Sequence, residues 1–148
     1  MQTHTEKNQT IDCLSSFLRG ELSAVETYRS ALEKIQTASM RTQLQDCLQS
    51  HESRVELLRN RIATLGGSPP TSSGIWGTFA KLYEGGAKTF GEHAAINALE
   101  QGEDHGRDDY RRELDKLDAD TRRWVEMQLL PAQLRTHSIV SALKKTQH

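Results

Sequence analysis

The sequence predicts an all-α protein, a four-helix bundle built from two antiparallel helical hairpins and a long crossover. One observation is a repeated pattern, in which Gly-Glu is followed at the same spacing by Tyr-Arg. It occurs at Gly20-Glu21 with Tyr28-Arg29 and again at Gly102-Glu103 with Tyr110-Arg111. Four stretches with apolar residues at three- and four-residue spacing, none of which alternates as a strand would, are the second observation.

The first helix is predicted over residues 10–36, with Thr10 as its N-cap. Spacings of three and four residues connect the members of its inward stripe, which is typical of a helix packed at a shallow angle in a bundle. The stripe consists of Ile11, Leu14, Leu18, Glu21, Val25, Tyr28, Leu32 and Ile35. Its one ionisable member is Glu21.

The second helix is predicted over residues 39–65, with Ser39 as a plausible cap. Gly66-Gly67 ends it, and Pro69-Pro70 prevents its continuation because proline lacks the backbone donor that a helix needs. The inward stripe consists of Leu44, Leu48, His51, Val55, Leu58, Ile62 and Leu65. His51 is the one polar residue among them.

Residues 66–88 form the predicted crossover, which becomes amphipathic in its second half and carries a short helix closed by Gly85-Gly86. A connector of this length inside a compact domain needs a structural reason. Ten extended residues reach about 33 Å and a short helix adds about 15 Å, enough to travel the length of a bundle. We therefore expect the second and third helices to run parallel.

The third helix is predicted over residues 89–117 and the fourth over residues 119–144. The inward stripe of the third consists of Ile96, Leu99, Glu103, Gly106, Tyr110, Leu114 and Leu117, and Gly106 would allow a close helix contact. An imperfect stripe in the fourth consists of Met127, Leu130, Leu134, His137 and Ser141. A kink is expected near residues 127–130, because Pro131 removes a backbone hydrogen bond there.

Composition narrows the class of protein. The chain has 148 residues, which suits a single domain over residues 1–148, and a formal net charge of -1. No basic stripe favours nucleic-acid binding, and no stretch is apolar for long enough to span a membrane, so a cytoplasmic protein is expected. Cys13 and Cys47 are interpreted as unpaired small hydrophobic residues.

Each predicted helix contributes one ionisable residue to its inward stripe: Glu21, His51, Glu103 and His137. A buried carboxylate is costly unless it is paired or bound to a cation. One interpretation is a metal site of these four residues, since bundles build such sites from inward-facing carboxylates and imidazoles. A polar cluster is another, and a stripe placed one residue out of register, with these groups facing solvent, is the third.

In the polar-cluster interpretation, which we prefer, protonated histidines and Arg54 compensate the two carboxylates. Tyr28 and Tyr110 would donate hydrogen bonds to the same carboxylates. The predicted cluster therefore consists of Glu21, Tyr28, His51, Arg54, Glu103, Tyr110 and His137. No catalytic residue is predicted, because the sequence contains neither a phosphate-binding loop nor a nucleophile motif.

The paired Glu and Tyr residues, the two hairpins and the Gly-Gly-x-Pro connector resemble the ferritin-like superfamily, specifically a bacterial branch of uncharacterised four-helix-bundle proteins. The resemblance covers residues from about Ile11 to Lys145. It implies a ferritin-like bundle, with a Glu on the first and third helices and Glu-x-x-His on the second and fourth. Glu21 and Glu103 match the lone glutamates.

The other two helices depart from that pattern. His51-x-x-Arg54 stands where the second helix would carry Glu-x-x-His, and the fourth helix offers Gln133-x-x-Thr136 with His137 one residue beyond. We therefore expect a non-enzymatic protein with a degenerate metal site and no cofactor, stress-related by resemblance. The alternative is an oxidoreductase or storage protein that binds iron or another divalent metal.

A homodimer is expected, and no protein partner is named by the sequence. A third functional hypothesis is self-association through the aromatic side chains Trp76, Phe79 and Tyr83 of the crossover. The interpretation of these aromatic residues that we prefer is that they cover the bundle.

Overall fold

A computed structural model describes the backbone of residues 4–74 and 77–146, and the side chains of residues 5–74 and 91–146. Every regular element in these ranges is a helix. The elements are α1 (His4–Leu32), α2 (Ala38–Thr64), α3 (Gly77–Glu113), the short 3₁₀ helix η2 (Leu114–Lys116), α4 (Ala119–Gln128) and α5 (Leu130–Lys145). The predicted all-α bundle is confirmed.

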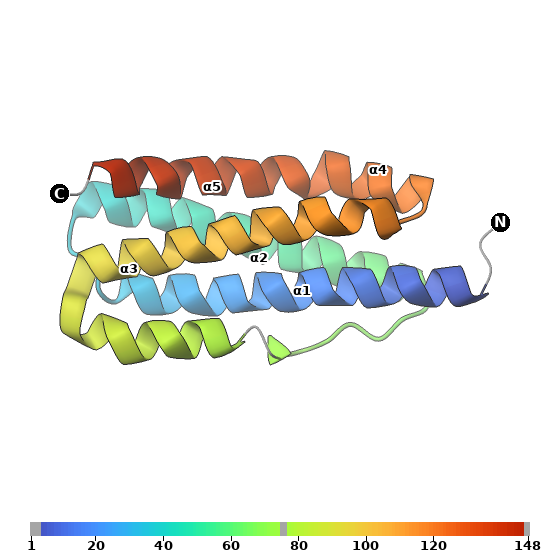
Figure 1. Cartoon of the computed structure of the whole chain (residues 1–148), viewed down its shortest axis with the longest axis horizontal. Coiled ribbons are helices and arrows are strands. Elements are labelled where there is room, and N and C mark those ends of the chain that lie inside the picture. The colour runs from blue at the N-terminus through green and yellow to red at the C-terminus, as the bar shows by residue number, and fades with distance from the viewer. Residues whose placement is uncertain (1–3, 75–76, 147–148) are drawn as a thin grey trace.

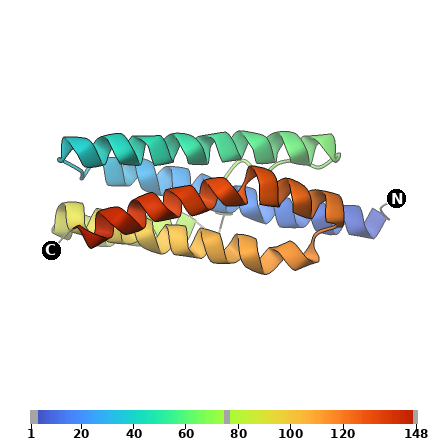
Figure 2. The same ribbon diagram turned by 90° about the horizontal axis from the view of Figure 1, so that it is seen from above.

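Helices α1, α2 and α3 lie side by side with a fourth long helical segment, which α4 and α5 form together (Figures 1 and 2). The chain returns from α1 through α2, crosses the length of the bundle, and then runs through α3 in the same direction as α2 (Figure 1). The expected parallel orientation of the second and third helices is therefore confirmed. α1 is antiparallel to α3, and α2 is antiparallel to α5.

The ends of the first two helices differ partly from the prediction. α1 begins at His4 rather than at Thr10, because the polar residues before Thr10 continue the helix without contributing to the core. It ends at Leu32, earlier than residue 36. α2 ends at Thr64, and Gly66 follows with a φ of 88°, as expected for a helix that stops at a glycine.

The third bundle helix starts close to the predicted residue 89, because α3 consists of two helices joined across a kink at Gly91, and the first of them is the helix expected in the crossover. Helical structure begins at Gly77 and continues through Gly85-Gly86, so that pair does not close the crossover helix. The break falls at Gly91, where φ is 67° and ψ is −139°, a conformation essentially restricted to glycine. The chain turns sharply there, and the part of α3 after Gly91 belongs to the bundle (Figure 1).

The fourth helix begins and bends where expected, but its inward stripe was predicted wrongly. Asp118 is the N-cap and accepts from the backbone N–H of Thr121 at 3.1 Å. The chain bends at Leu129, between α4 and α5, just before Pro131. The buried residues are Thr121, Val125, Leu129, Gln133, Thr136, Val140 and Leu143.

The prediction placed this stripe wrongly because two of its inward positions are occupied by the polar residues Gln133 and Thr136, which an apolar pattern does not include. Met127, by contrast, is 67% exposed. For this helix alone the stripe was out of register. The stripes predicted for the first three helices are confirmed, including Glu21, His51 and Glu103, all nearly fully buried.

Two apolar clusters fill the bundle. One is centred on Leu44, Ile96 and Val140, and the other on Leu18, Leu58 and Leu129. Tyr28 belongs to the first cluster and Tyr110 to the second. Tyr28 contacts Glu103, and Tyr110 lies beside Glu21. The two buried carboxylates therefore border both apolar clusters.

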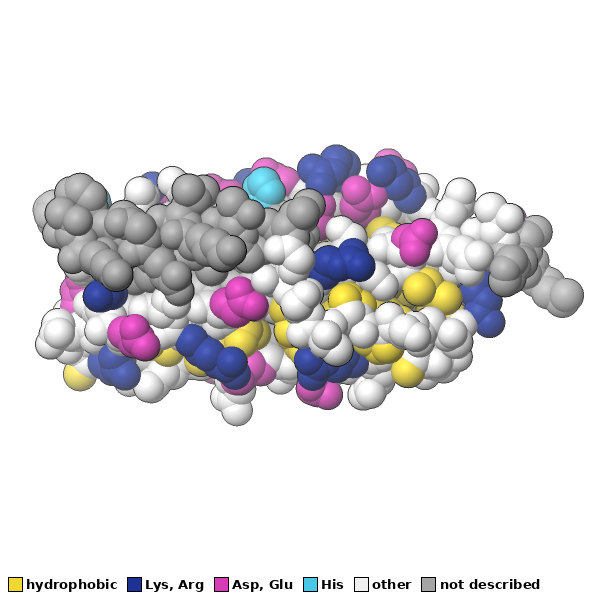
Figure 3. All heavy atoms as spheres, turned by 90° about the horizontal axis from the view of Figure 1, so that it is seen from below, with side chains coloured by type: hydrophobic (Ala, Val, Ile, Leu, Met, Phe, Trp, Pro, Cys, Tyr) yellow, Lys and Arg dark blue, Asp and Glu magenta, His cyan; other side chains and the backbone are white. Residues whose placement is uncertain are grey.

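The surface carries both signs of charge. On the face shown in Figure 3, acidic and basic side chains of the described residues are interspersed and neither sign dominates. Within the described part of the chain, no helix combines the length and apolar character needed to cross a membrane.

Candidate functional site

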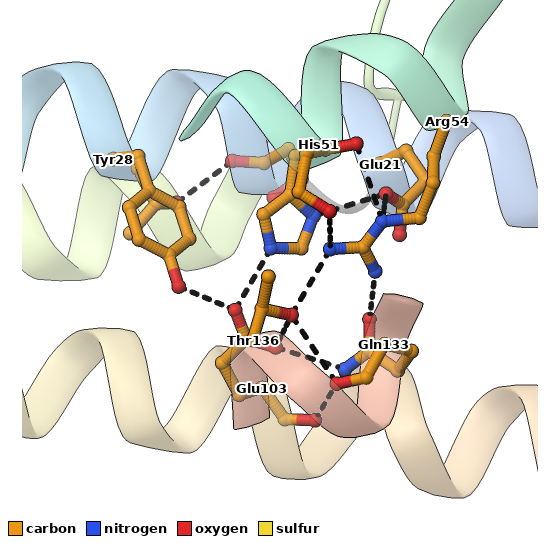
Figure 4. A network of polar contacts seen from close by, with 10 residues as sticks. Glu21, Tyr28, His51, Arg54, Glu103, Gln133 and Thr136 are labelled. Atoms are coloured by element: carbon orange, nitrogen blue, oxygen red, sulfur yellow. Dashed lines mark hydrogen bonds and ion pairs between the residues drawn. The ribbon is translucent and has the colours of Figure 1, made fainter. Parts of the chain in front are cut away.

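A buried histidine joins the two repeated glutamates. The Nδ1 atom of His51 lies 3.0 Å from Oε2 of Glu21, and its Nε2 atom lies 2.8 Å from Oε2 of Glu103. The three side chains come from α1, α2 and α3 and point toward one another in the middle of the bundle (Figure 4). His51 therefore bridges the two carboxylates, and both of its ring nitrogens are used.

Arg54, one turn after His51 on α2, is 1% exposed. Its Nε atom lies 3.4 Å from Oε2 of Glu21, and its two terminal nitrogens donate to Gln133 and Thr136 on α5. A buried guanidinium needs this many acceptors, since each unpaired donor would carry a desolvation cost. The guanidinium thus links α1, α2 and α5 (Figure 4).

Gln133 and Thr136 complete the cluster on α5. The Gln133 amide donates to the Glu103 backbone oxygen at 2.9 Å and to its Oε1 at 3.0 Å, and the Thr136 hydroxyl lies 2.8 Å from the same Oε1. Gly106 makes this approach possible, because a Cβ there would lie 3.1 Å from the Gln133 amide nitrogen. The close helix contact expected at Gly106 is confirmed.

The two repeated tyrosines occupy matching but unequal positions. The Tyr28 hydroxyl on α1 donates to Oε2 of Glu103 on α3. In the antiparallel register of α1 and α3, Tyr110 takes the corresponding place beside Glu21, where its ring packs against Phe17 at an interplanar angle of 44°, with centroids 4.5 Å apart. The Tyr110 hydroxyl is buried and completes no well-formed hydrogen bond among the described residues.

The charges of the cluster balance. Burial opposes ionisation of both carboxylates, but Arg54 and His51 outweigh it for Glu21, and His51 followed by Arg54 outweighs it for Glu103, so each pKa falls below 4.5. Burial and Arg54 also disfavour protonated His51, yet the two carboxylates raise its pKa above 6.5. Two negative charges thus face an imidazolium and a guanidinium.

His137 does not belong to this cluster, and its predicted place is corrected. It lies one residue beyond the inward position, with Nε2 2.6 Å from Asp104 and 3.0 Å from an Arg107 nitrogen. This group is at the edge of the bundle, where the Asp104 side chain is 47% exposed. Thr136 holds the inward position that the prediction gave to His137.

Gln133 and Thr136 were absent from the predicted set. The alignment of the two hairpins, which matches Gln133 to His51 and Thr136 to Arg54, had pointed to these two positions, but His137 was assigned to the cluster instead. Cys13 and Cys47 are both free, and burial, followed by nearby carboxylates, raises the pKa of each thiol to about 12. The side chains of Trp76, Phe79 and Tyr83 lie outside the described residues.

The residues present do not fit a two-metal centre of the ferritin-like kind. Such a centre uses two lone glutamates and two Glu-x-x-His pairs, whereas this cluster keeps only the lone glutamates. The one imidazole already contacts a carboxylate through each nitrogen, and a guanidinium stands 3.4 Å from Glu21. In the described part of the chain, no group of three or more His, Cys, Asp or Glu residues is arranged to hold a metal ion.

Fold and site together define a helical-bundle protein with a buried, charge-balanced cluster at its centre. A family model for a domain of unknown function, DUF2383, matches residues 9–116, and the chain belongs to this family. The match covers α1, α2, the crossover and the bundle part of α3, and so includes every cluster residue except Gln133 and Thr136. Comparisons with curated proteins and with solved structures find no match.

Proposed function

We propose that this protein is a ferritin-like, non-enzymatic bundle in which a permanent ion cluster has replaced a metal centre. One observation carries the proposal: His51 lies between Glu21 and Glu103 and contacts both carboxylates. A metal ion shared by two glutamates would have to occupy the same region. The protonated imidazole supplies positive charge there, and Arg54 supplies the rest.

The consequence of this replacement is structural. A bound metal must be acquired and can be lost, whereas His51 and Arg54 belong to the chain and compensate the carboxylates whenever the protein is folded. The cluster then holds the four helices in one register, a role known for some buried polar groups. By resemblance, the biological role is stress-related and cytoplasmic.

The experiment is a metal count. The protein is purified without an affinity tag, incubated anaerobically with Fe(II), Mn(II) or Zn(II), desalted and analysed by mass spectrometry, alongside the Glu21→Gln, Glu103→Gln double variant. The proposal expects no retained metal in the wild type. One or two ions per chain, lost in the double variant, would refute it.

A metal-binding protein is the second candidate. Glu21, His51 and Glu103 do converge, and carboxylate and imidazole are ligands that divalent metals accept. Binding would require His51 to release a proton and at least one carboxylate contact. Because this competition depends on protonation, metal retention that rises with pH from about 6 to 9 would favour the second candidate over the first.

We also propose that the chain forms a homodimer, with the crossover aromatic residues as the candidate contact. Sedimentation of the wild type and of Trp76→Ser tests both parts. A dimer that becomes monomeric in the variant supports the contact. An unchanged mass in the variant discards it, and a monomeric wild type discards the dimer itself.

A further inference from the structure

A cavity of about 270 Å³ lies between α1 and α3, beside the charge cluster. Its size is relevant because an apolar cavity of about 150 Å³ is enough to admit benzene. The proposed structural role of the cluster does not need this space. The cavity is partly open to the surface, and it is much larger than the few voids that a well-packed interior leaves, so it requires its own explanation.

Small residues on the two helices create the space. Gly20 and Ala24 line it from α1, and Gly102 and Gly106 line it from α3. Glycine in a helix interior weakens the helix relative to alanine. Close packing against Gln133 accounts for Gly106, whereas Gly20 and Gly102, one from each copy of the repeated pattern, line the cavity.

The chemistry of the lining restricts what could bind. Phe17 and Leu99 give it apolar walls, and the cluster at its inner side is already neutral, with two carboxylates matched by His51 and Arg54. Asp109, which also lines the cavity, is paired with Arg112. A charged ligand would lose its hydration without gaining a free counter-charge. The cavity therefore suits an uncharged and mainly apolar molecule.

One polar group of the lining remains unsatisfied. The Tyr110 side chain contributes to the cavity wall and is 2% exposed, and its hydroxyl lies near the Glu21 carboxylate but completes no hydrogen bond of good geometry within the described ranges. Buried hydroxyls nearly always have a partner. An oxygen atom of a bound molecule would supply the missing acceptor.

We propose that the cavity between α1 and α3 is a binding site for a small, uncharged, mainly apolar molecule that carries one hydrogen-bond acceptor, received by the Tyr110 hydroxyl. The site is separate from any metal question, since it needs only the cavity walls and one tyrosine. It would give this bundle a ligand-carrying or ligand-sensing capacity.

The probes for the test are acetophenone, which has a carbonyl acceptor, and ethylbenzene, which has a similar size and none. Each is titrated into the ¹⁵N-labelled full-length chain while amide chemical shifts are recorded. The proposal expects saturable shifts confined to amides around Gly20 and Gly102. Acetophenone should bind the more tightly of the two.

Variants separate the two parts of the proposal. Ala24→Leu fills the cavity and should abolish binding of both probes, whereas Gln101→Leu adds the same side chain at an exposed position of α3 and should change neither. Gly102→Ala, which improves helix propensity and so guards against misfolding, should weaken both probes. Tyr110→Phe should weaken acetophenone about five-fold, the effect of one neutral hydrogen bond, and leave ethylbenzene unchanged.

The outcomes are decisive in both directions. No saturable shift with either probe, or shifts that persist in both Ala24→Leu and Gly102→Ala, would overturn the site. Equal loss of both probes in Tyr110→Phe, or no loss of acetophenone, would overturn the role of the hydroxyl. Selective weakening of acetophenone, together with loss in the filled variants, establishes the proposal.

Discussion

The Tyr28 hydroxyl on α1 donates a hydrogen bond to the Glu103 carboxylate on α3, across 75 positions of sequence. Each residue is one half of a repeated Glu-Tyr pair, but the bond joins the tyrosine of the first copy to the glutamate of the second. Antiparallel packing of α1 and α3 requires this exchange, because it brings the end of one pattern beside the start of the other. The repeated pattern thus helps to fix the register of the two hairpins against each other.

The two repeated tyrosines should respond differently to loss of their hydroxyl groups. Tyr28→Phe removes a donor to a charged acceptor and is expected to cost about 1.5–3 kcal/mol of unfolding free energy. Tyr110→Phe removes a hydroxyl that completes no well-formed hydrogen bond, so it should cost much less than Tyr28→Phe. Chemical denaturation of both variants measures the difference. Equal destabilisation would contradict the asymmetry.

Arg54 should be indispensable for stability. Arg54→Met keeps much of the side-chain length but removes the positive charge beside Glu21 and the donors to Gln133 and Thr136, so a loss of about 3–5 kcal/mol is expected. Arg59→Met is the control, since its ion pair with Glu56 is largely exposed and should be worth less than about 1 kcal/mol. Denaturant midpoints similar for the two variants would show that the buried guanidinium is not required.

Stability should fall on both sides of an intermediate pH range. The pKa of His51 is raised above 6.5, so its contribution is complete below 6.5 and is lost as the pH rises through the folded-state pKa. The pKa values of Glu21 and Glu103 are lowered below 4.5. The contribution of these two carboxylates to stability is therefore complete above pH 4.5 and is lost as the pH falls through their folded-state pKa values.

Thermal unfolding between pH 3 and 10 checks this dependence. In His51→Gln the decline on the alkaline side should be smaller, because the titrating imidazole is gone, although the variant is less stable at neutral pH. His105→Gln is the matched control, at an exposed position. An alkaline decline of the same size in His51→Gln and the wild type would exclude His51 as its source.

If the proposed ferritin-like arrangement is right, the bundle should accept metal once the ligands of that pattern are restored. A variant with His51→Glu, Arg54→His, Gln133→Glu and Thr136→His carries Glu-x-x-His on both α2 and α5, facing Glu21 and Glu103. We expect it to bind two Co(II) ions per chain, visible as d–d absorption, where the wild type binds none. A variant that carries only the two α2 substitutions, with the native Gln133 and Thr136 on α5, should lose one or both ions. A folded quadruple variant without Co(II) absorption would show that the bundle is unsuited.

Glu92 fixes the start of α2 from another helix. Its Oε2 accepts from the backbone N–H groups of Gln36 at 2.6 Å and Thr37 at 2.9 Å, and these bonds lower the pKa of Glu92 below 4.5. Glu92→Gln keeps an acceptor oxygen but removes the negative charge at the N-terminus of α2, so it should cost about 0.3–1 kcal/mol. Glu33→Gln serves as an exposed control, and urea unfolding at pH 7 compares them.

Much of this fold could be predicted, since burial of apolar residues in the first three helices leaves a regular pattern. The break at Gly91 could not, because nothing in the residues around it distinguishes that glycine from Gly85 or Gly86. Gly91 differs from them only in its backbone conformation, which turns the chain into the bundle. The early start of α1 was missed because polar residues at a helix end leave no periodic signal.

The cluster was predictable to the extent that its members interrupt apolar stripes. Glu21, His51 and Glu103 stand out in this way, and Arg54 follows as the next turn of the same helix. Gln133 and Thr136 do not interrupt a stripe; they belong to one that the apolar residues of α5 do not trace. His137 was predicted in their place because it is the ionisable residue in the stripe predicted for the fourth helix, one position beyond Thr136.

The same offset along the chain separates Glu21 from Glu103, Tyr28 from Tyr110, His51 from Gln133 and Arg54 from Thr136. A protein made of two identical hairpins would therefore place a second imidazole and a second guanidinium in its core, leaving an excess of two positive charges when all are protonated. Gln133 and Thr136 provide hydrogen bonds at those positions and no charge. The balance of two carboxylates against one imidazolium and one guanidinium is thus a product of broken symmetry between the two halves of the chain.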